Sequence, residues 1–139
     1  MRKFLIATHG TFSKGVKSSL DIIIGPMENV FLIEAYVNEN KSIEEELLVI
    51  LQQVKEEDEL VIFSDLLGGS ITNQVLLTAR KDNVHIVSGF NLPLLLDIIL
   101  ADAGDPVITV IESAIQNAKD QIVYVNKLTT STREESLDD

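Results

Sequence analysis

Extended apolar runs alternate with segments of helical periodicity along most of this chain, and that alternation constrains the fold more than any other feature. The runs expected to be strands are Lys3 to Thr8, Val30 to Val37, Glu59 to Asp65 and Val84 to Ser88. Strands that alternate with helices in a short chain are joined by right-handed crossovers, so the sheet should be mostly parallel. The sequence therefore predicts an open, doubly wound α/β fold with four parallel strands.

Local signals place the ends of the connecting helices. Gly25-Pro26 ends the first helical pattern, because neither residue readily continues a helix. Ser42 with Glu45 three residues later forms a capping-box pattern at the start of the second helix. The turn Gly68-Gly69-Ser70 precedes a third helix. Each of these helices would connect two consecutive strands.

The last third of the chain is less regular. Leu92 to Leu100 forms a helical segment that is apolar on nearly every side, so it should be either deeply buried or covered by another chain. A further helix is expected over Pro106 to Lys119 and a fifth strand over Ile122 to Val125. Residues 129–139 are polar and show no periodicity. We therefore expect one domain over residues 1–128, followed by a polar C-terminal tail.

The composition excludes several classes of function. The chain has 139 residues, which suits one domain, and its net charge of −11 argues against binding to nucleic-acid phosphates. The acidic surface either favours encounter with a basic partner or only keeps the protein soluble. The absence of cysteine excludes disulfides, thiolate catalysis and cysteine-bound zinc, and we expect neither a metal nor a cofactor. The apolar runs Phe4 to Ala7 and Leu92 to Ala101 are too short for a signal peptide or a membrane span, so a cytoplasmic protein is expected.

His9 is the leading candidate for a catalytic side chain. It lies in the small polar loop Thr8-His9-Gly10 directly after the first expected strand, and doubly wound sheets bind ligands at the carboxyl ends of their strands. Neutral imidazole is a nucleophile toward phosphorus near pH 7. The alternative is an ordinary surface histidine. The other histidine, His85, lies inside the fourth expected strand and is interpreted as structural.

Asp65 ends the third expected strand and so falls on the same rim of the sheet as His9. A carboxylate that accepts a hydrogen bond from Nδ1–H of the histidine would fix the tautomer and leave Nε2 free to attack. The alternative role for Asp65 is that of a turn or helix-capping residue.

The turn Gly68-Gly69-Ser70 is a candidate phosphoryl-binding element. Two glycines allow the backbone to approach an anion closely, and the unpaired N–H groups of a first helical turn act as donors. The hydroxyls of Ser70 and Thr72 would add to them. Most Gly-Gly-Ser turns have no binding role, so the motif is a candidate only because it is expected on the same rim as His9.

Taken together, these motifs resemble the EIIA component of the mannose class of the bacterial sugar phosphotransferase system. The matching positions are Thr8-His9-Gly10, Asp65 with Gly68-Gly69-Ser70, Asn73, and Gly89-x-Asn91-Leu92-Pro93. The resemblance runs from about Lys3 to the fifth expected strand. Many relatives read Gly-Gly-Ser-Pro-Phe-Asn, whereas this chain has Ile71 and Thr72 after Ser70.

The resemblance implies a phosphoryl carrier. His9 would be phosphorylated at Nε2 by the phosphohistidine carrier protein HPr and would pass the group to an EIIB domain on a separate chain. That domain would phosphorylate sugar during import through the membrane proteins EIIC and EIID. Asp65 would hold His9, and the Ser70 region would bind the phosphoryl group. The resemblance also implies a homodimer in which the last strand is exchanged between subunits.

Three other interpretations remain open from the sequence. The phosphotransfer subunit of dihydroxyacetone kinase has a similar first domain, although it resembles this chain less at Gly-Gly-Ser. A hydrolase is suggested because Thr8-His9-Gly10 resembles the Arg-His-Gly start of histidine phosphatases, but the preceding arginine and a second catalytic histidine are not evident. A receiver-like binding module would require acidic residues after the first strand, where this chain has Thr8 and His9.

Overall fold

The structure, a computed structural model, describes residues 1–128. The predicted polar tail, residues 129–139, lies outside the described residues. The elements in chain order are β1 (Arg2–His9), α1 (Phe12–Ile24), β2 (Val30–Ala35), α2 (Ile43–Leu51), β3 (Glu59–Ser64), α3 (Ser70–Ala79), β4 (Val84–Ser88), α4 (Leu92–Ile99) and α5 (Val107–Asp120). The four predicted strands and the connecting helices are therefore confirmed, with strand ends that differ by one or two residues.

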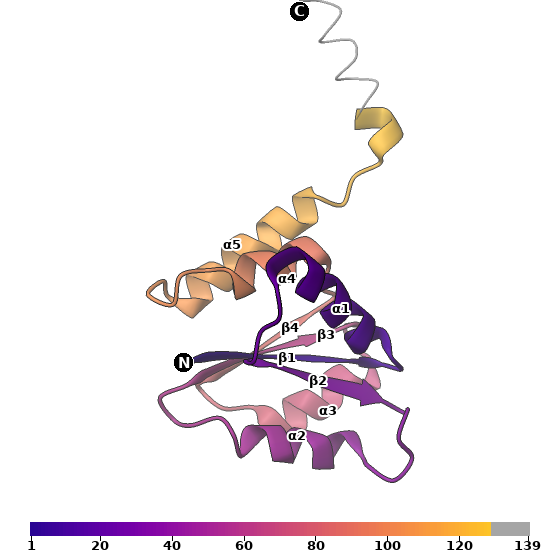
Figure 1. The fold of residues 1–139 in the computed structure, drawn as a ribbon, viewed down its shortest axis with the longest axis vertical. Helices are drawn as coiled ribbons and strands as arrows, with labels where there is room; N and C mark the ends of the chain where they lie inside the picture. The colour runs from indigo at the N-terminus through magenta and orange to yellow at the C-terminus, as the bar shows by residue number, and fades with distance from the viewer. Residues whose placement is uncertain (129–139) are drawn as a thin grey trace, which may run out of the picture.

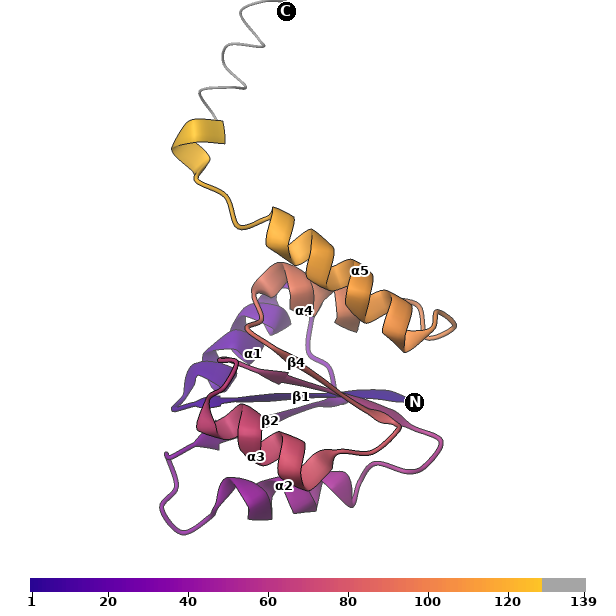
Figure 2. The same cartoon turned by 180° about the vertical axis from the view of Figure 1, so that it is seen from behind.

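The four strands form one open sheet in the order β2-β1-β3-β4, and every neighbouring pair is parallel. Helices α1, α4 and α5 cover one face, whereas α2 and α3 cover the other (Figures 1 and 2). This arrangement confirms the predicted doubly wound α/β fold. The winding direction changes between β1 and β3, so the carboxyl ends of these two strands form the switch point at which such folds bind ligands.

Both faces of the two central strands are buried, which explains why β1 and β3 read as continuous apolar runs. Along β1, Phe4 and Ile6 pack under α1, α4 and α5, and Leu5 packs on the opposite side under α2 and α3. The ring of Phe4 stacks on that of Phe63 with 6.3 Å between centroids. The two hydrophobic layers hold the central strands firmly, and with them the loops at their carboxyl ends.

The predicted capping box is present at the start of α2. Ser42 Oγ accepts a hydrogen bond from the backbone N–H of Glu45 at 3.1 Å, and Glu45 Oε2 accepts one from the backbone N–H of Ser42 at 3.4 Å. Two donors that the first helical turn leaves unpaired are thereby satisfied. The helix start is fixed by local sequence alone.

One side of the apolar helix α4 is buried by its own chain. Leu94, Leu95, Ile98 and Ile99 are buried between the sheet, α1 and α5, and Asn91 caps the helix by accepting a hydrogen bond from Leu94 N at 3.0 Å. Deep burial is therefore confirmed for these four residues. Leu92 and Leu100 of the same apolar segment stay 36% and 61% exposed, so cover by a second chain stays a prediction.

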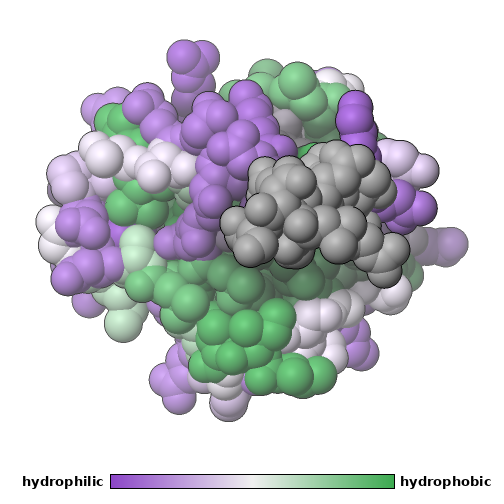
Figure 3. All heavy atoms as spheres, turned by 90° about the horizontal axis from the view of Figure 1, so that it is seen from above, coloured by the Kyte–Doolittle hydropathy of each residue, from purple (hydrophilic) through white to green (hydrophobic). Residues whose placement is uncertain are grey.

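The fifth strand predicted at Ile122 to Val125 is absent from the single chain. Residues 122–124 have no regular secondary structure and residues 125–128 form a helical turn. A strand needs a neighbour with which to pair, and this segment leads away from the sheet (Figures 1 and 2). Its apolar side chains are consequently exposed, among them Ile122 at 75% and Tyr124 at 73%. Figure 3, which looks down on this end of the molecule, shows a group of apolar residues on its surface.

Within residues 1–128, no helix is both long and apolar enough to cross a membrane.

Candidate functional site

His9 and Asp65 meet at the carboxyl ends of the two central strands. Ala7 of β1 pairs in register with Ser64 of β3, so the residues that follow these two are neighbours across the sheet. Gly10 turns the chain out of β1 with a φ of 58°, a left-handed conformation that suits glycine, and its N–H donates to Ala35 O at 2.9 Å. The loop that carries His9 is therefore tied to both neighbouring strands.

Asp65 Oδ2 accepts two hydrogen bonds from His9, from the backbone N–H at 2.9 Å and from ring Nδ1 at 2.8 Å. Burial raises the pKa of the Asp65 carboxyl, but the hydrogen bonds from His9 and the attraction of its ring outweigh this effect, so the net pKa lies below the ordinary 3.8. The carboxylate is thus ionised at neutral pH and can only accept hydrogen bonds. The ring proton of neutral His9 is therefore assigned to Nδ1, which leaves the lone pair of Nε2 available.

The side chains of Asp65 and His9 differ in their exposure to solvent. The Asp65 side chain is 12% exposed and that of His9 is 40% exposed. The second carboxylate oxygen, Asp65 Oδ1, is buried and has no hydrogen-bond partner among the described residues. The acceptor is sheltered from water, whereas the imidazole can be approached from solvent.

The Gly68-Gly69-Ser70 turn lies directly beside the His9 ring. Gly68 has a φ of 75° and turns the chain, and Gly69 is the N-cap of α3 with no side chain capping the helix. A Cβ at Gly69 would lie 3.7 Å from His9 Cε1 and 3.4 Å from both Leu66 Cβ and Leu66 O. The first backbone N–H groups of α3, which have no partners inside the helix, thus begin next to the imidazole.

Ser70 and Thr72 differ in where their hydroxyls lie. Ser70 Oγ is at the surface and lies 2.6 Å from the hydroxyl of Tyr36. Thr72 is buried; its Oγ1 donates to Leu66 O at 2.6 Å and lies 2.7 Å from Ser64 Oγ. The structure therefore brings Ser70 to the open side of the site, while Thr72 holds the loop from inside.

Tyr36 is the site residue that sequence reasoning missed. It follows β2 directly, and its ring lies 5.8 Å from that of His9, measured between centroids, at an angle of 37°. An exposed aromatic residue straight after a strand was the available signal. Its meaning depends on β2 being the neighbour of β1, which the sequence pattern leaves undetermined.

The loop Gly89-Phe90-Asn91 reaches the same rim, but its contacts are structural. Gly89 N donates to Ser64 O at 2.9 Å, Phe90 stacks on Phe12 with 5.7 Å between centroids, and Asn91 Nδ2 donates to Ala118 O at 3.1 Å. These contacts join the ends of β3 and β4 to α1 and α5. They brace the rim beside the site.

His85 lies away from this cluster. It pairs in register with Val61 in β3, and its Nε2 is 4.0 Å from Glu59 Oε2, near the amino end of the sheet. Its interpretation as a structural residue stays a prediction. Within residues 1–128, no group of three or more His, Asp or Glu side chains is arranged to hold a metal ion.

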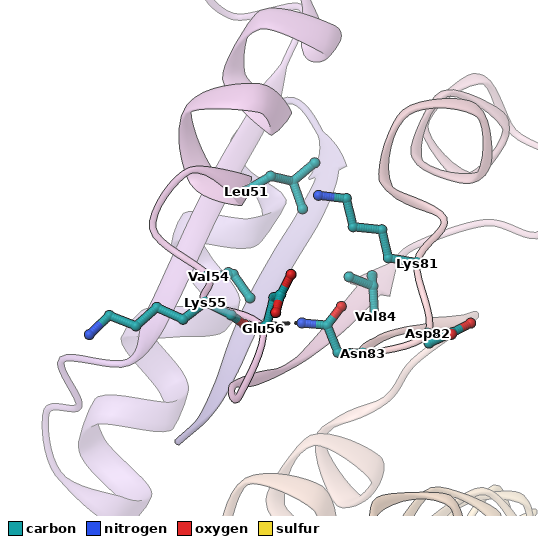
Figure 4. Close-up of a pocket in the computed structure, with 8 residues that line it drawn as sticks. All are labelled: Leu51, Val54, Lys55, Glu56, Lys81, Asp82, Asn83 and Val84. Carbon is teal, nitrogen blue, oxygen red and sulfur yellow. Dashed lines mark hydrogen bonds between the residues drawn. The ribbon is translucent and has the colours of Figure 1, made fainter.

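A pocket of about 440 Å³ opens at the opposite end of the sheet, where the strands begin (Figure 4). Its polar wall includes Lys55, Glu56, Lys81 and Asn83, and Asn83 Nδ2 donates to Lys55 O at 3.1 Å. Since none of the residues around His9 contributes to it, this pocket is separate from the candidate site.

Comparison with known proteins identifies a family whose model matches most of this chain. The family model EIIA-man, described as the PTS system fructose IIA component, matches residues 3–115. The mannose-specific EIIAB component of Escherichia coli K12 is 25% identical over 104 residues, which cover 73% of this chain and 32% of that protein. The chain therefore spans about a third of the length of the curated relatives it matches.

Solved structures show the same fold. A Klebsiella pneumoniae protein named as a phosphoenolpyruvate-dependent sugar phosphotransferase system permease superposes with a TM-score of 0.86 at 30% identity, over 92% of this chain and 93% of that one. A phosphotransferase system component EIIA from Streptococcus agalactiae superposes with a TM-score of 0.77 at 28% identity, over 91% and 99% of the two chains.

Proposed function

Because the chain belongs to the EIIA-man family of the sugar phosphotransferase system, we propose that it accepts a phosphoryl group from HPr on His9 and passes it to an EIIB domain. Membership makes it an EIIA-type component of this system; the donor, the acceptor and the residues are our proposal. The observation that carries it is the 2.8 Å contact between His9 Nδ1 and Asp65 Oδ2. We also propose that the chain acts in the cytoplasm, where it would meet both partners.

The proposed transfer uses the lone pair that the Asp65 contact leaves at Nε2. This nitrogen attacks the phosphorus of phospho-HPr, and a new P–N bond forms as the bond from phosphorus to the donor nitrogen breaks. The donor nitrogen keeps the electron pair, and the proton on His9 Nδ1 stays in place. Asp65 stabilises the positive charge that develops on the ring as the bond forms. The onward step reverses this chemistry toward a histidine of EIIB.

The start of α3 is proposed to hold the phosphoryl oxygens. Free backbone N–H groups at a helix N-terminus bind anions, and the helix dipole adds to the attraction. The lack of side chains at Gly68 and Gly69, together with the closeness of Gly69 to His9 Cε1, supports a phosphoryl site beside the proposed reacting nitrogen. Ser70 would donate from its hydroxyl. Thr72 would act indirectly, because its own proton is already donated to Leu66 O.

The histidine-phosphatase alternative loses support in the tertiary structure. That chemistry needs an arginine before the histidine and a second catalytic histidine at the site. Thr8 precedes His9 and is buried, with its Oγ1 accepting a hydrogen bond from Ser13 N at 2.7 Å. The other histidine, His85, lies toward the far edge of the sheet.

Labelling from radioactive phosphoenolpyruvate tests the proposal. With the first enzyme of the system and HPr, the chain should acquire one acid-labile phosphoryl group on His9. The label should then move to a mannose-class EIIB domain. Transfer to the nucleotide-binding subunit of dihydroxyacetone kinase instead would favour that alternative. Absence of label from phospho-HPr would contradict the proposal.

We also propose a homodimer in which Ile122 to Val125 pairs with a second copy. Strand β4 is an edge strand of the sheet, so one of its edges has no partner strand within residues 1–128. A groove of about 400 Å³ runs beside it and is lined largely by apolar side chains, including Val84, Ile86 and Ile111. An extended apolar segment of a second chain would cover this edge and bury its own exposed side chains.

In the proposed relay, this chain acts on the membrane proteins EIIC and EIID only indirectly, through EIIB.

A further inference from the structure

Tyr36 has a backbone conformation that its type rarely adopts. Its φ is 67°, and it is the only residue other than glycine with a positive φ within residues 1–128. A bulky side chain in this left-handed region is disfavoured by contact between Cβ and the backbone, so it persists only where the surroundings require it. The residue before it is held in place, because Ala35 pairs in register with His9 and accepts a hydrogen bond from Gly10 N.

Burial does not explain this conformation, since Tyr36 is 66% exposed. Its contacts are instead with the site. The ring lies 5.8 Å from that of His9, and the hydroxyl lies 2.6 Å from Ser70 Oγ. The left-handed backbone at Tyr36, directly after β2, thus occurs together with a side chain that lies against the rim. The disfavoured backbone conformation therefore accompanies a tyrosine side chain that contacts both His9, the proposed nucleophile, and Ser70 at the start of α3.

Resting on the proposed function, we propose that Tyr36 is a positioning residue for phosphoryl transfer, acting through Ser70 and His9. Only one of two paired hydroxyls can donate to the other. The phenolic hydroxyl of Tyr36 is more acidic than the aliphatic hydroxyl of Ser70, so Tyr36 is the better donor and Ser70 the better acceptor. In that arrangement the proton of Ser70 is free to point at a phosphoryl oxygen on His9 Nε2. The tyrosine ring at the same time limits rotation of the imidazole, whose Nδ1 is already held by Asp65.

Tyr36→Phe tests the hydroxyl without removing the ring. A hydrogen bond to a partner at the surface contributes roughly a factor of three to ten to an equilibrium or a rate. We expect the rate of His9 phosphorylation to fall about three- to tenfold, with Tm unchanged because the hydroxyl is exposed. The rate should be measured with phospho-HPr and separately with phosphoramidate. This small donor also carries a P–N bond and releases ammonia as Nε2 takes its phosphoryl group, but it makes no protein contact.

A double-mutant cycle with Ser70→Ala identifies the route of the effect. If Tyr36 acts through Ser70, Tyr36→Phe should have little further effect in the Ser70→Ala background, because the hydroxyl it orients is already gone. A purely structural tyrosine would give additive losses together with a lower Tm.

The outcomes separate this inference from the proposed function. If the wild-type chain is not labelled on His9 by phospho-HPr, the proposed function is wrong. If the wild type is labelled and Tyr36→Phe is equally fast, the positioning role is wrong. A loss seen with phospho-HPr but not with phosphoramidate would make Tyr36 a docking contact and overturn the inference, and so would additivity with Ser70→Ala. A loss with both donors that vanishes in the Ser70→Ala background supports it.

Discussion

Asp65 Oδ2 accepts a hydrogen bond from the backbone N–H of His9 at 2.9 Å and another from its ring Nδ1 at 2.8 Å. One oxygen atom thereby fixes both the main chain and the side chain of the same residue. The backbone contact holds the loop in place while the ring contact sets the tautomer. Substitutions at the two positions should consequently have different effects.

Replacing His9 with Ala should abolish phosphoryl acceptance and leave the fold intact. The side chain is 40% exposed and lies outside both hydrophobic layers, so the free energy of unfolding should change by no more than about 1 kcal/mol. Labelling from phospho-HPr measures the first effect and urea unfolding the second. His85→Gln is the matched control and should be labelled like the wild type. Acid-labile label on the His9→Ala chain would show that another residue is the nucleophile.

Asp65→Asn should slow transfer on the order of tenfold or more, because an amide of similar shape can present its NH₂ group to Nδ1 and no longer stabilises a cationic ring. Single-turnover labelling gives the rate. A rate equal to that of the wild type would show that Asp65 has no role in transfer and acts only as a turn residue.

The same substitution should alter the pH dependence of stability. His9 lowers the pKa of the Asp65 carboxyl in the folded state below 3.8, so this group stabilises the fold above pH 3.8 and the contribution is lost as pH falls through the folded-state pKa. Urea midpoints between pH 7 and pH 3 should therefore fall less steeply for Asp65→Asn than for the wild type.

Gly69→Ala should fold normally but transfer phosphoryl slowly. The added methyl group would make ordinary contacts with Leu66 at 3.4 Å and would lie 3.7 Å from His9 Cε1, in the space proposed for the phosphoryl oxygens. We expect a rate loss on the order of tenfold or more, because small displacements at a reacting centre are costly. Gly15→Ala is the control: Gly15 is exposed in α1 with no atom near its Cβ position, so stability should rise by about 0.5–1 kcal/mol while the rate stays unchanged.

Asp58 should stabilise the amino-terminal edge of the sheet in a pH-dependent way. The backbone N–H of Lys55, the terminal ammonium of Met1 and the Lys3 ammonium hold the pKa of its carboxyl well below the ordinary 3.8. The contribution is present above pH 3.8 and lost as pH falls below it. Asp58→Asn should lower the free energy of unfolding at pH 7 and flatten its acid dependence. Asp82→Asn, at an exposed carboxyl in the nearby pocket wall, should do neither.

Deleting the chain from Gln121 onward should weaken the proposed dimer and lower solubility, because the edge of β4 would lose its expected partner strand. Deleting only residues 129–139 should do neither. Sedimentation of the full chain and of both deletions at micromolar concentration measures the association. A full-length chain that sediments as a monomer would contradict the exchanged strand.

Much of the fold followed from local patterns. β1 and β3 are central strands with both faces buried, so their sequences are apolar throughout and were recognised directly. The capping box of Ser42 and Glu45 depends only on residues three apart and is formed as predicted. The meeting of His9 with Asp65 was also predictable, because the carboxyl ends of parallel strands lie on one rim.

Other features depended on contacts between distant segments. Whether α5 or a second chain covers α4 is decided by packing, and the sequence left both open. A strand at Ile122 to Val125 requires an edge to pair with, which the single chain does not bring to that segment. The inward direction of the Thr72 hydroxyl is set by Ser64 and Leu66 O, neither of which helical periodicity identifies.

The sequence by itself determined the fold class and the strand positions, since both depend on hydrophobic periodicity, and a general rule for parallel sheets put His9 and Asp65 on one rim. Their direct contact depends on β1 lying beside β3. Only the tertiary structure decided that Tyr36 belongs to the same site. Its place there requires β2 to lie beside β1 and its backbone to adopt a φ of 67°. Both are properties of the assembled sheet, in which neighbouring strands and the His9 loop impose a conformation that the local sequence around Tyr36 does not favour.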